Sequence, residues 1–302
     1  MTSGKPLAAI APFNLEATVR VLQRRPANRV EVLEDGRYRR LFETPQGLVL
    51  AEVENKGSIE APNLRWRVRH GEANEMLPAK LASMLGLDID PAPLLRMAAA
   101  EDALRPTAEA LLGMRPPRFG EWYEAFGNVI PFQQVSLEAG IAIVGRFIER
   151  FGQRLEFDSR AYFSFPDPAV VADASTERVR ECGLSRTKAE SLQRIARLIA
   201  SGELSKEKIA ALPTDDAIAA LEELPGIGPW SAGLVLLRGL GRLDVFPPGD
   251  VGAMRGLNKL LRLESDDELA HVVKRFGEYR GYLYFHALGR SLLDKGLIQH
   301  AS

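Results

Sequence analysis

The sequence is poor in the residues that build several common kinds of site. It has one cysteine, Cys182, which excludes a disulfide framework, a four-cysteine zinc site and a cysteine-ligated iron–sulfur cluster. Its four histidines show no metal-ligand spacing. A single cysteine is usual for a protein of the reducing cytoplasm, and we expect that location.

Long apolar runs and an excess of charge are also missing. No stretch approaches the ~20 apolar residues that a membrane span needs, and the first residues hold no long apolar core, so neither a membrane partner nor a signal peptide is expected. The net charge is −1, so bulk charge does not point to any partner. With 302 residues, 46% of them hydrophobic and 26% charged, the chain has a globular composition and room for about two domains.

The first third of the chain has the pattern of a sheet. Hydrophobic residues alternate with polar ones over residues 28–34, 37–43, 47–54 and 63–70, and Asp35-Gly36 is a hairpin signal. In the last of these segments Arg65, Arg67 and Arg69 share one phase. We read that face as a solvated one rather than a phosphate-binding one.

From residue 77 the hydrophobic period becomes helical, and helices are expected through most of the remaining chain. Arg115-Pro116-Pro117-Arg118 is typical of a linker or sharp turn. The sequence therefore predicts an α+β protein, with a mixed N-terminal domain over residues 1–113 whose antiparallel sheet lies mainly at 28–70. A mostly helical body is expected over residues 114–302, with a cleft.

Residues 214 to 250 carry the clearest functional signal. The order is a helix, then Leu224-Pro-Gly-Ile-Gly228, then Pro229-Trp230 opening a second helix. Such a turn presents bare backbone N–H groups at a helix N-terminus. These groups can bind a phosphate, and they do not distinguish one base from another. A plain turn between two helices explains the same residues equally well.

Asp250 follows twenty residues after Trp230, behind a Pro-Pro-Gly loop and before another helix. An aspartate at that point is a good N-cap. It could also be a catalytic carboxylate held at the edge of a cleft. The residue alone does not decide between the two.

Taken together, the hairpin Leu224-Pro-Gly-Ile-Gly-Pro-Trp230-Ser-Ala232 and the aspartate resemble the helix-hairpin-helix DNA glycosylase superfamily, and within it the bacterial 3-methyladenine DNA glycosylase II group. Weaker matches surround them, at residues 128–137, Phe165–Pro168, Cys182–Ala189, Tyr279–Tyr282 and His286-Ala287. The resemblance spans about residues 10 to 295, with the helix-hairpin-helix at about 214–240. It implies an enzyme that flips alkylated purines of the 3-methyladenine and 7-methylguanine type out of duplex DNA and hydrolyses the N-glycosidic bond.

The resemblance also implies roles for particular residues. Asp250 matches the catalytic aspartate, which stabilises an oxocarbenium-like sugar. Trp230 would stack on a cationic base, although it could be an ordinary core tryptophan. Gln134 matches the wedge that fills the vacated stack, although it could be a plain exposed polar residue. The other implied contacts are Tyr279 and Leu234 to the base, and Gly226, Ile227, Gly228 and Ser231 to DNA.

One absence narrows the reaction. Members that also nick the strand carry a lysine just after the Gly-x-Gly turn, where this chain has Trp230. Lysine occurs nowhere between residues 209 and 258. Water is then the nucleophile, no lyase activity is expected and the product is an abasic site. Two alternatives stay open: a glycosylase for an oxidised or deaminated base, and a non-catalytic DNA-damage binder.

The resemblance implies no required cofactor. It does imply a possible structural Na⁺ or K⁺ held by the main-chain carbonyls of Glu222, Leu224 and Ile227. The expected partner is double-stranded DNA with damaged bases. A monomer is expected, in the cytoplasm and associated with the nucleoid.

Overall fold

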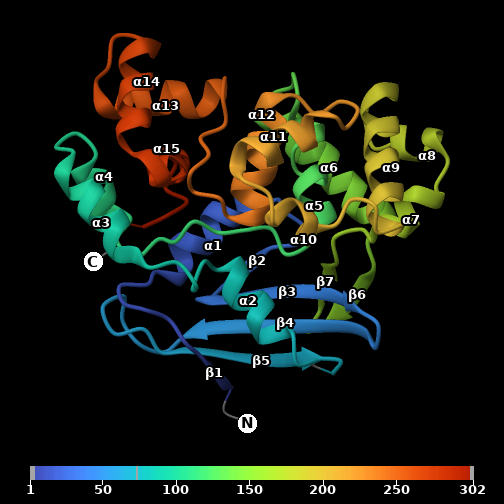
Figure 1. The fold of residues 1–302 in the computed structure, drawn as a ribbon. Coiled ribbons are helices and arrows are strands. Elements are labelled where there is room, and N and C mark those ends of the chain that lie inside the picture. Colours follow the sequence, from blue (N-terminus) through green and yellow to red (C-terminus); the bar gives the residue numbers. More distant parts are fainter. Residues whose placement is uncertain (1–3, 73, 300–302) are drawn as a thin grey trace.

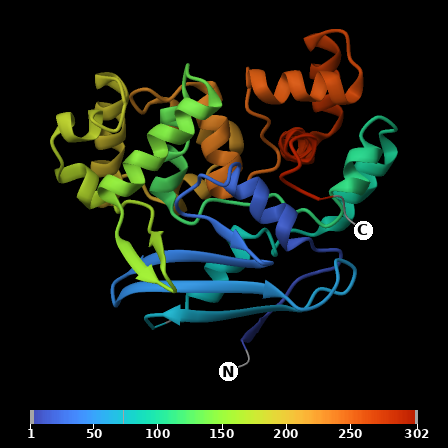
Figure 2. The same cartoon turned by 180° about the vertical axis from the view of Figure 1, so that it is seen from behind.

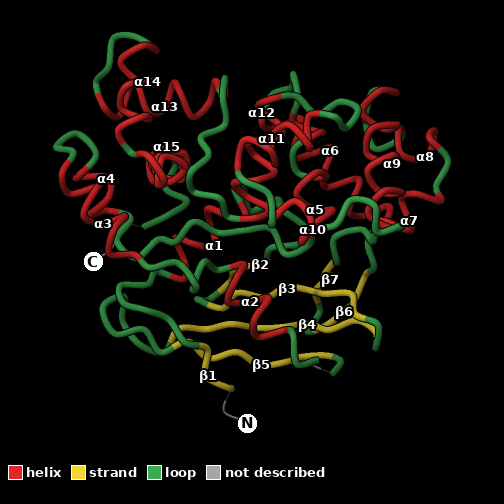
Figure 3. The backbone as a smooth tube through the Cα atoms, in the orientation of Figure 1, coloured by secondary structure: helices red, strands yellow, loops and turns green. Residues whose placement is uncertain are grey.

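A five-stranded antiparallel sheet forms one layer of the molecule, and helices form the other (Figures 1 and 3). The computed structural model describes residues 4–72 and 74–299. The strand order is β1-β5-β4-β3-β2, with every neighbouring pair antiparallel. The strands are β1 (Lys5–Leu7), β2 (Val32–Glu34), β3 (Arg37–Thr44), β4 (Gly47–Asn55) and β5 (Leu64–His70).

The local signals of the sheet act as the sequence predicts. Asp35 and Gly36 both adopt positive φ, 48° and 69°, and close the β2–β3 hairpin. In β5, Leu64 and Trp66 are buried whereas the intervening arginines are only partly so. This alternation is that of a sheet with one face on the core.

Helices follow the sheet from residue 77 as expected, but one earlier helix, α1 (Leu15–Gln23), was not expected. The other N-terminal ones are α2 (Leu77–Met84), α3 (Pro91–Ala100) and α4 (Arg105–Ala110). The body contains α5 (Trp122–Gly127), α6 (Leu137–Phe151), α7 (Pro168–Asp173), α8 (Thr176–Arg180), α9 (Arg186–Ala200), α10 (Lys206–Ala210), α11 (Thr214–Glu222), α12 (Pro229–Val235), α13 (Val251–Leu261), α14 (Asp266–Arg275) and α15 (Arg280–Asp294). Three short turns of other helix types are η1 (Ile130–Phe132), η2 (Leu236–Leu240) and η3 (Gly277–Tyr279), of which η2 is a π-helical extension of α12. No helix among the described residues has the length and apolar character to cross a membrane.

A two-stranded hairpin of β6 (Arg154–Phe157) and β7 (Arg160–Phe163) lies within the body and was not expected. It extends down to the sheet (Figure 2). There Tyr162 packs with Val32, Leu41 and Leu50, on the side of the sheet away from the main core. The hairpin therefore connects the sheet to the helical body by a hydrophobic contact on this side.

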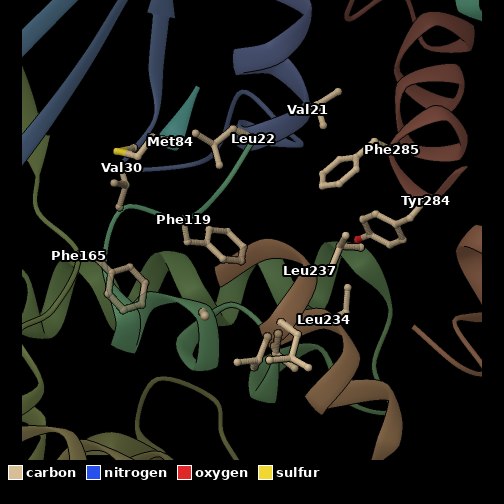
Figure 4. Packing of buried hydrophobic residues seen from close by; sticks show 14 of the residues in the cluster. Val21, Leu22, Val30, Met84, Phe119, Phe165, Leu234, Leu237, Tyr284 and Phe285 are labelled. Atoms are coloured by element: carbon tan, nitrogen blue, oxygen red, sulfur yellow. The ribbon is translucent and has the colours of Figure 1, made fainter. Parts of the chain in front are cut away.

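One continuous hydrophobic core joins the sheet to the helices. It runs from Leu22 of α1 and Met84 of α2, through Phe119, to Leu237 and Phe285 in the body (Figure 4). The α+β class is thus confirmed, with an N-terminal sheet and a mostly helical body. The boundary between residues 113 and 114 stays a prediction, because the two parts share this core.

A buried ionic cluster also crosses between the two parts. Arg40 of β3 pairs with Glu31, and its Nη2 donates to Glu124 Oε2 of α5 at 2.5 Å. All three side chains are at most 3% exposed. Burial raises the pKa of Glu31, and Arg40 partly offsets that effect.

Candidate active site

The helix-hairpin-helix expected at 214–240 is formed by α11, a tight turn and α12. Gly226 in the turn has φ +80°, a conformation that a side chain strongly disfavours. Gly228 is the N-cap of α12 and Pro229 its first helical residue. Ile227 is 5% exposed, and its N–H donates to the Leu224 carbonyl at 3.1 Å. The buried side chain of Ile227 thus anchors the turn to the hydrophobic core.

The two glycines of the turn differ in what they require. A Cβ on Gly226 would lie 2.6 Å from Ser191 Oγ of α9, whereas a Cβ on Gly228 would meet nothing within 4 Å. We expect Gly226→Ala to lower the free energy of unfolding by about 1–3 kcal/mol. Gly228→Ala should cost at most about 1 kcal/mol, as a weakened N-cap. Urea unfolding of both variants measures this, and equal losses would contradict the close approach to α9.

The loop that carries Gln134 is tied to this turn. Gln133 Nε2 donates to the Gly226 carbonyl at 2.7 Å and to Ser231 Oγ at 2.9 Å. From the other side, Lys188 Nζ donates to the Gln133 carbonyl at 2.6 Å. Gln134 itself is exposed and has φ +54°. The exposed side chain of Gln134 therefore projects from a loop that is fixed to the hairpin.

The side chain of Ser231 is buried. We expected it to contact DNA, but its side chain is 3% exposed and its hydroxyl accepts the hydrogen bond from Gln133. Its hydroxyl therefore faces inward, because it lies where α12 meets the η1–α6 loop. The contact of Ser231 with DNA stays a prediction, which its backbone N–H in the first turn of α12 would fulfil.

Asp250 is both an N-cap and a member of a cavity. Its Oδ1 accepts from the Ala253 N–H at 2.8 Å and so caps α13. Its Oδ2 accepts from Trp230 Nε1 at 2.9 Å. Both oxygens of this carboxylate are thus oriented by hydrogen bonds. The N-cap is confirmed, and the catalytic role of Asp250 stays a prediction.

The cavity beside Asp250 has a volume of about 280 Å³, near the lower end of ligand pockets. Trp230 and Leu234 of α12 line it together with Asp250. Trp230 is only partly buried and packs against the core. The structure thus brings together three of the residues that the sequence singled out.

Tyr279 does not line this cavity, contrary to our expectation. It lies in η3, before α15 begins, and is partly buried against the core. The residues of α15 that line the cavity are Tyr284, Ala287, Leu288 and Ser291. These share one face of the helix, at the i, i+3, i+4 and i+7 spacing. Tyr284 is therefore the aromatic side chain that α15 contributes to the described lining of the cavity.

The sequence also gave no sign of Arg24 and Phe132, which line the cavity too. Arg24 Nη2 donates to Tyr284 Oη at 2.5 Å across 260 residues of sequence. No local pattern reports a contact of that separation. His286, by contrast, is fully buried with Nδ1 3.1 Å from the Tyr282 carbonyl, as a packed helix residue.

Comparison with known proteins agrees with this architecture. The model of the HhH-GPD superfamily of base excision DNA repair proteins matches residues 128–278, and the AlkA N-terminal domain model matches residues 6–121. The chain belongs to the HhH-GPD superfamily. The resemblance inferred from the hairpin and Asp250 is thereby confirmed.

Similar members of the superfamily include two bacterial proteins and one archaeal structure. A DNA-3-methyladenine glycosylase of Bacillus subtilis is 32% identical over 66% of this chain and 67% of its own length. DNA-3-methyladenine glycosylase 2 of Escherichia coli is 27% identical over 79% of this chain and 82% of its own. The structure of a 3-methyladenine DNA-glycosylase from Archaeoglobus fulgidus superposes with a TM-score of 0.80 at 25% identity, over 95% of this chain and 98% of that one.

The residues that line the cavity also indicate which nucleophile the reaction uses. Among the described residues that line it there is no lysine. The basic side chain on this lining is that of Arg24. Its guanidinium stays protonated at neutral pH and therefore does not form a Schiff base. The roles of Asp250, Trp230, Leu234 and Gln134 stay predictions, now supported by their placement.

Proposed function

We propose that the protein is a monofunctional DNA glycosylase that excises alkylated purines from duplex DNA and leaves an abasic site. The observation that carries the proposal is the Asp250 carboxylate on the lining of a base-sized cavity, with Oδ2 held by Trp230 Nε1 at 2.9 Å. That cavity adjoins a helix-hairpin-helix, an element suited to sequence-independent contact with phosphates.

The chemistry follows from these positions. A flipped purine enters the cavity and lies against Trp230, whose electron-rich face attracts a base made cationic by alkylation. The bond between C1′ and the base nitrogen breaks, and the base leaves with the electron pair. Asp250 stabilises the positive charge that develops on the sugar and orients the water that adds to C1′. The water loses one proton to solvent.

Water is the nucleophile in this proposal because none of the described residues that line the cavity is a lysine. We therefore expect the DNA strand to stay intact until the abasic site is cleaved by alkali. Base release from methylated duplex DNA, measured together with strand cleavage, tests both halves of the proposal.

Gln134 is proposed as the wedge that fills the gap left by the flipped nucleotide. Its exposure and its fixed loop, whose next residue Val135 lines the cavity, support that role. We expect Gln134→Ala to weaken binding to abasic-site DNA by about threefold to tenfold, the loss of one or two weak contacts. Gln153→Ala, at an exposed position beside β6, is the control. Fluorescence anisotropy measures both, and equal affinities for Gln134→Ala and wild type would refute the role.

A monovalent cation is proposed at the hairpin, on the carbonyls of Glu222, Leu224 and Ile227. The carbonyls at the end of α11 lie at the negative end of its dipole. Among the described residues no group of three or more His, Cys, Asp or Glu side chains is placed to hold a metal ion. Replacing choline chloride with NaCl or KCl at constant ionic strength should raise the Tm by about 1–3 °C. An unchanged Tm with both salts would contradict the site.

The proposed working form is a monomer that acts on double-stranded DNA in the nucleoid. Each functional group named above comes from one chain, so the site is complete without a partner copy. Sedimentation equilibrium of the free protein checks this form.

A further inference from the structure

The cavity beside Asp250 lies between two groups of helices. Most of its lining comes from η1, α6 and α12 on one side and from α13 and α15 on the other. The hairpin turn and the Gln134 loop belong to the first group, and α13 lies apart from them, beside α14 (Figures 1 and 2). A duplex centred on the cavity therefore has one arm on the side of the hairpin and the other arm on the side of α13.

One face of α13 carries three positive charges. Arg255, Lys259 and the C-cap residue Arg262 are exposed, and their spacing of four and three residues places them on the same face of the helix. The segment from residue 251 to residue 262 contains no aspartate or glutamate. Its buried residues lie on the other face, where α13 packs against α15. We call the three exposed cations the α13 stripe.

The α13 stripe continues the lining of the cavity. Gly252 lines the cavity next to Asp250, and Val251 before it is 65% exposed. From Gly252 to Arg262 the helix rises about 15 Å, at 1.5 Å per residue. Each strand of duplex DNA carries one phosphate per about 3.4 Å of helix axis, so the stripe has the length of about four phosphates.

The charges of the α13 stripe have no partner within the described part of the chain. None of the three forms an ion pair or a side-chain hydrogen bond there. On the neighbouring helices, by contrast, Arg275 pairs with Glu101 and Arg290 pairs with Asp294. The net charge of the chain is −1, so the stripe is a local concentration of positive charge and does not reflect a basic protein. Its place beside the cavity distinguishes it from an ordinary solvated face.

We propose that the α13 stripe binds the phosphate backbone of one arm of the duplex, next to the nucleotide that enters the cavity. The inference rests on the proposed glycosylase function and assigns a surface through which the enzyme holds its DNA. Arginine and lysine bind phosphates without reading bases, which suits an enzyme that meets damage in any sequence. With the hairpin on one side and α13 on the other, the backbone is held on both sides of the flipped nucleotide. This binding energy offsets the cost of taking the base out of the stack.

The salt dependence of binding tests the proposal. The probe is a duplex with a central, stable abasic-site analogue, and fluorescence anisotropy measures its Kd between about 0.1 and 1 M KCl. We expect Arg255→Gln combined with Lys259→Gln to weaken binding at least about tenfold at the lowest salt. The slope of log Kd against log salt should fall by about 2, since each lost phosphate contact releases about one counterion fewer. An unchanged slope would overturn the inference.

Two further variants keep this result independent of folding. Glutamine is as good a helix former as arginine and lysine, so the helix and the Tm should persist in the combined variant. Arg255→Lys combined with Lys259→Arg keeps both charges and should keep the slope of wild type. A slope that falls as much in this charge-conserving variant would show that charge on α13 is not the cause, and would overturn the inference.

Shortened duplexes test whether a single arm of the DNA is bound. One duplex keeps about ten base pairs on the 5′ side of the analogue and about two on the 3′ side, and the second has the reverse arrangement, since the stripe spans about four base pairs. The combined glutamine variant should bind one of these duplexes as tightly as wild type does and should show its full loss on the other. Equal losses on both duplexes would assign the effect to general electrostatics and overturn the inference.

Arg37→Gln combined with Lys56→Gln is the matched control for the loss of two positive charges. Both residues pair with Glu54, at 3.7 and 3.2 Å, and about half of each side chain is exposed. They lie at the sheet, which supplies none of the described residues that line the cavity. We expect the slope of wild type, and a fall as large as that of the α13 variant would overturn the specific contact.

The same measurements separate this inference from the proposed function. The analogue has no base to release, so its binding does not depend on catalysis. A protein that released no base from methylated DNA, but showed the loss on one arm, would contradict the proposed function and support the role of α13. A protein that released methylated purines, but whose glutamine variant kept the slope of wild type, would support the function and overturn the role of α13.

Discussion

Asp250→Asn is expected to lower the rate of base release by about 10²–10³-fold, the usual loss when one electrostatic stabiliser of a transition state is removed. Asparagine caps a helix about as well as aspartate, so the bond to the Ala253 N–H and the fold should persist. The negative charge is lost, and an amide nitrogen cannot accept the hydrogen bond from Trp230 Nε1. Single-turnover base release and DNA affinity, measured on the same samples, test whether the variant loses rate while it keeps its fold and its binding of DNA.

Asp167→Asn provides the matched control, because Asp167 is also an N-cap aspartate, with Oδ1 2.7 Å from the Ala169 N–H of α7, and it does not line the cavity. It should leave base release unchanged. Full activity of Asp250→Asn would mean that the carboxylate serves only as a cap. A lower affinity for DNA equal to the loss of rate would assign Asp250 to binding rather than to the reaction.

Arg40→Met is expected to lower the free energy of unfolding by about 3–5 kcal/mol, the largest change in stability that we predict. The substitution leaves Glu31 and Glu124 buried with no positive charge between them. These carboxylates come from the sheet side and from α5, so their repulsion acts across the shared core. Urea unfolding with a two-state fit gives the value.

The control lies on the same strand. Arg37 pairs with Glu54 at 3.7 Å and is 46% exposed, so Arg37→Met should cost less than about 1 kcal/mol. Adding Glu31→Gln and Glu124→Gln to Arg40→Met should recover part of the stability, because the unpaired charges are then removed. Equal losses for Arg40→Met and Arg37→Met would show that the buried cluster is no more important than a surface pair.

The parts of the site that could be predicted from the sequence depend on short stretches of chain. Gly226, Gly228 and Pro229 define a turn by their own backbone preferences, and Asp250 carries the signature of a cap. The N-cap was therefore foreseeable from one residue. The second oxygen of Asp250 accepts a hydrogen bond from Trp230, and this contact depends on how α12 and α13 pack together. The spacing of the two residues in the sequence does not predict it.

The parts that were missed depend on contacts between distant segments. Arg24 and Tyr284 meet across 260 residues, and the buried hydroxyl of Ser231 accepts a hydrogen bond from Gln133, 98 residues away in sequence. Tyr279 was chosen by its position in a motif and Tyr284 was not considered, whereas the helical face that starts at Tyr284 is the one that lines the cavity. The β6–β7 hairpin was missed because its strands have four residues each and its turn is Asp158-Ser159 instead of a glycine turn.

The measurement that tests the central claim most directly is base release from methylated duplex DNA by the wild-type protein, with the products identified by mass and the strands sized before and after alkali. The account predicts free methylated purines and strands that break only after alkali, as expected for hydrolysis by water at a site without a lysine. No released base, or strands already broken before alkali, would contradict it.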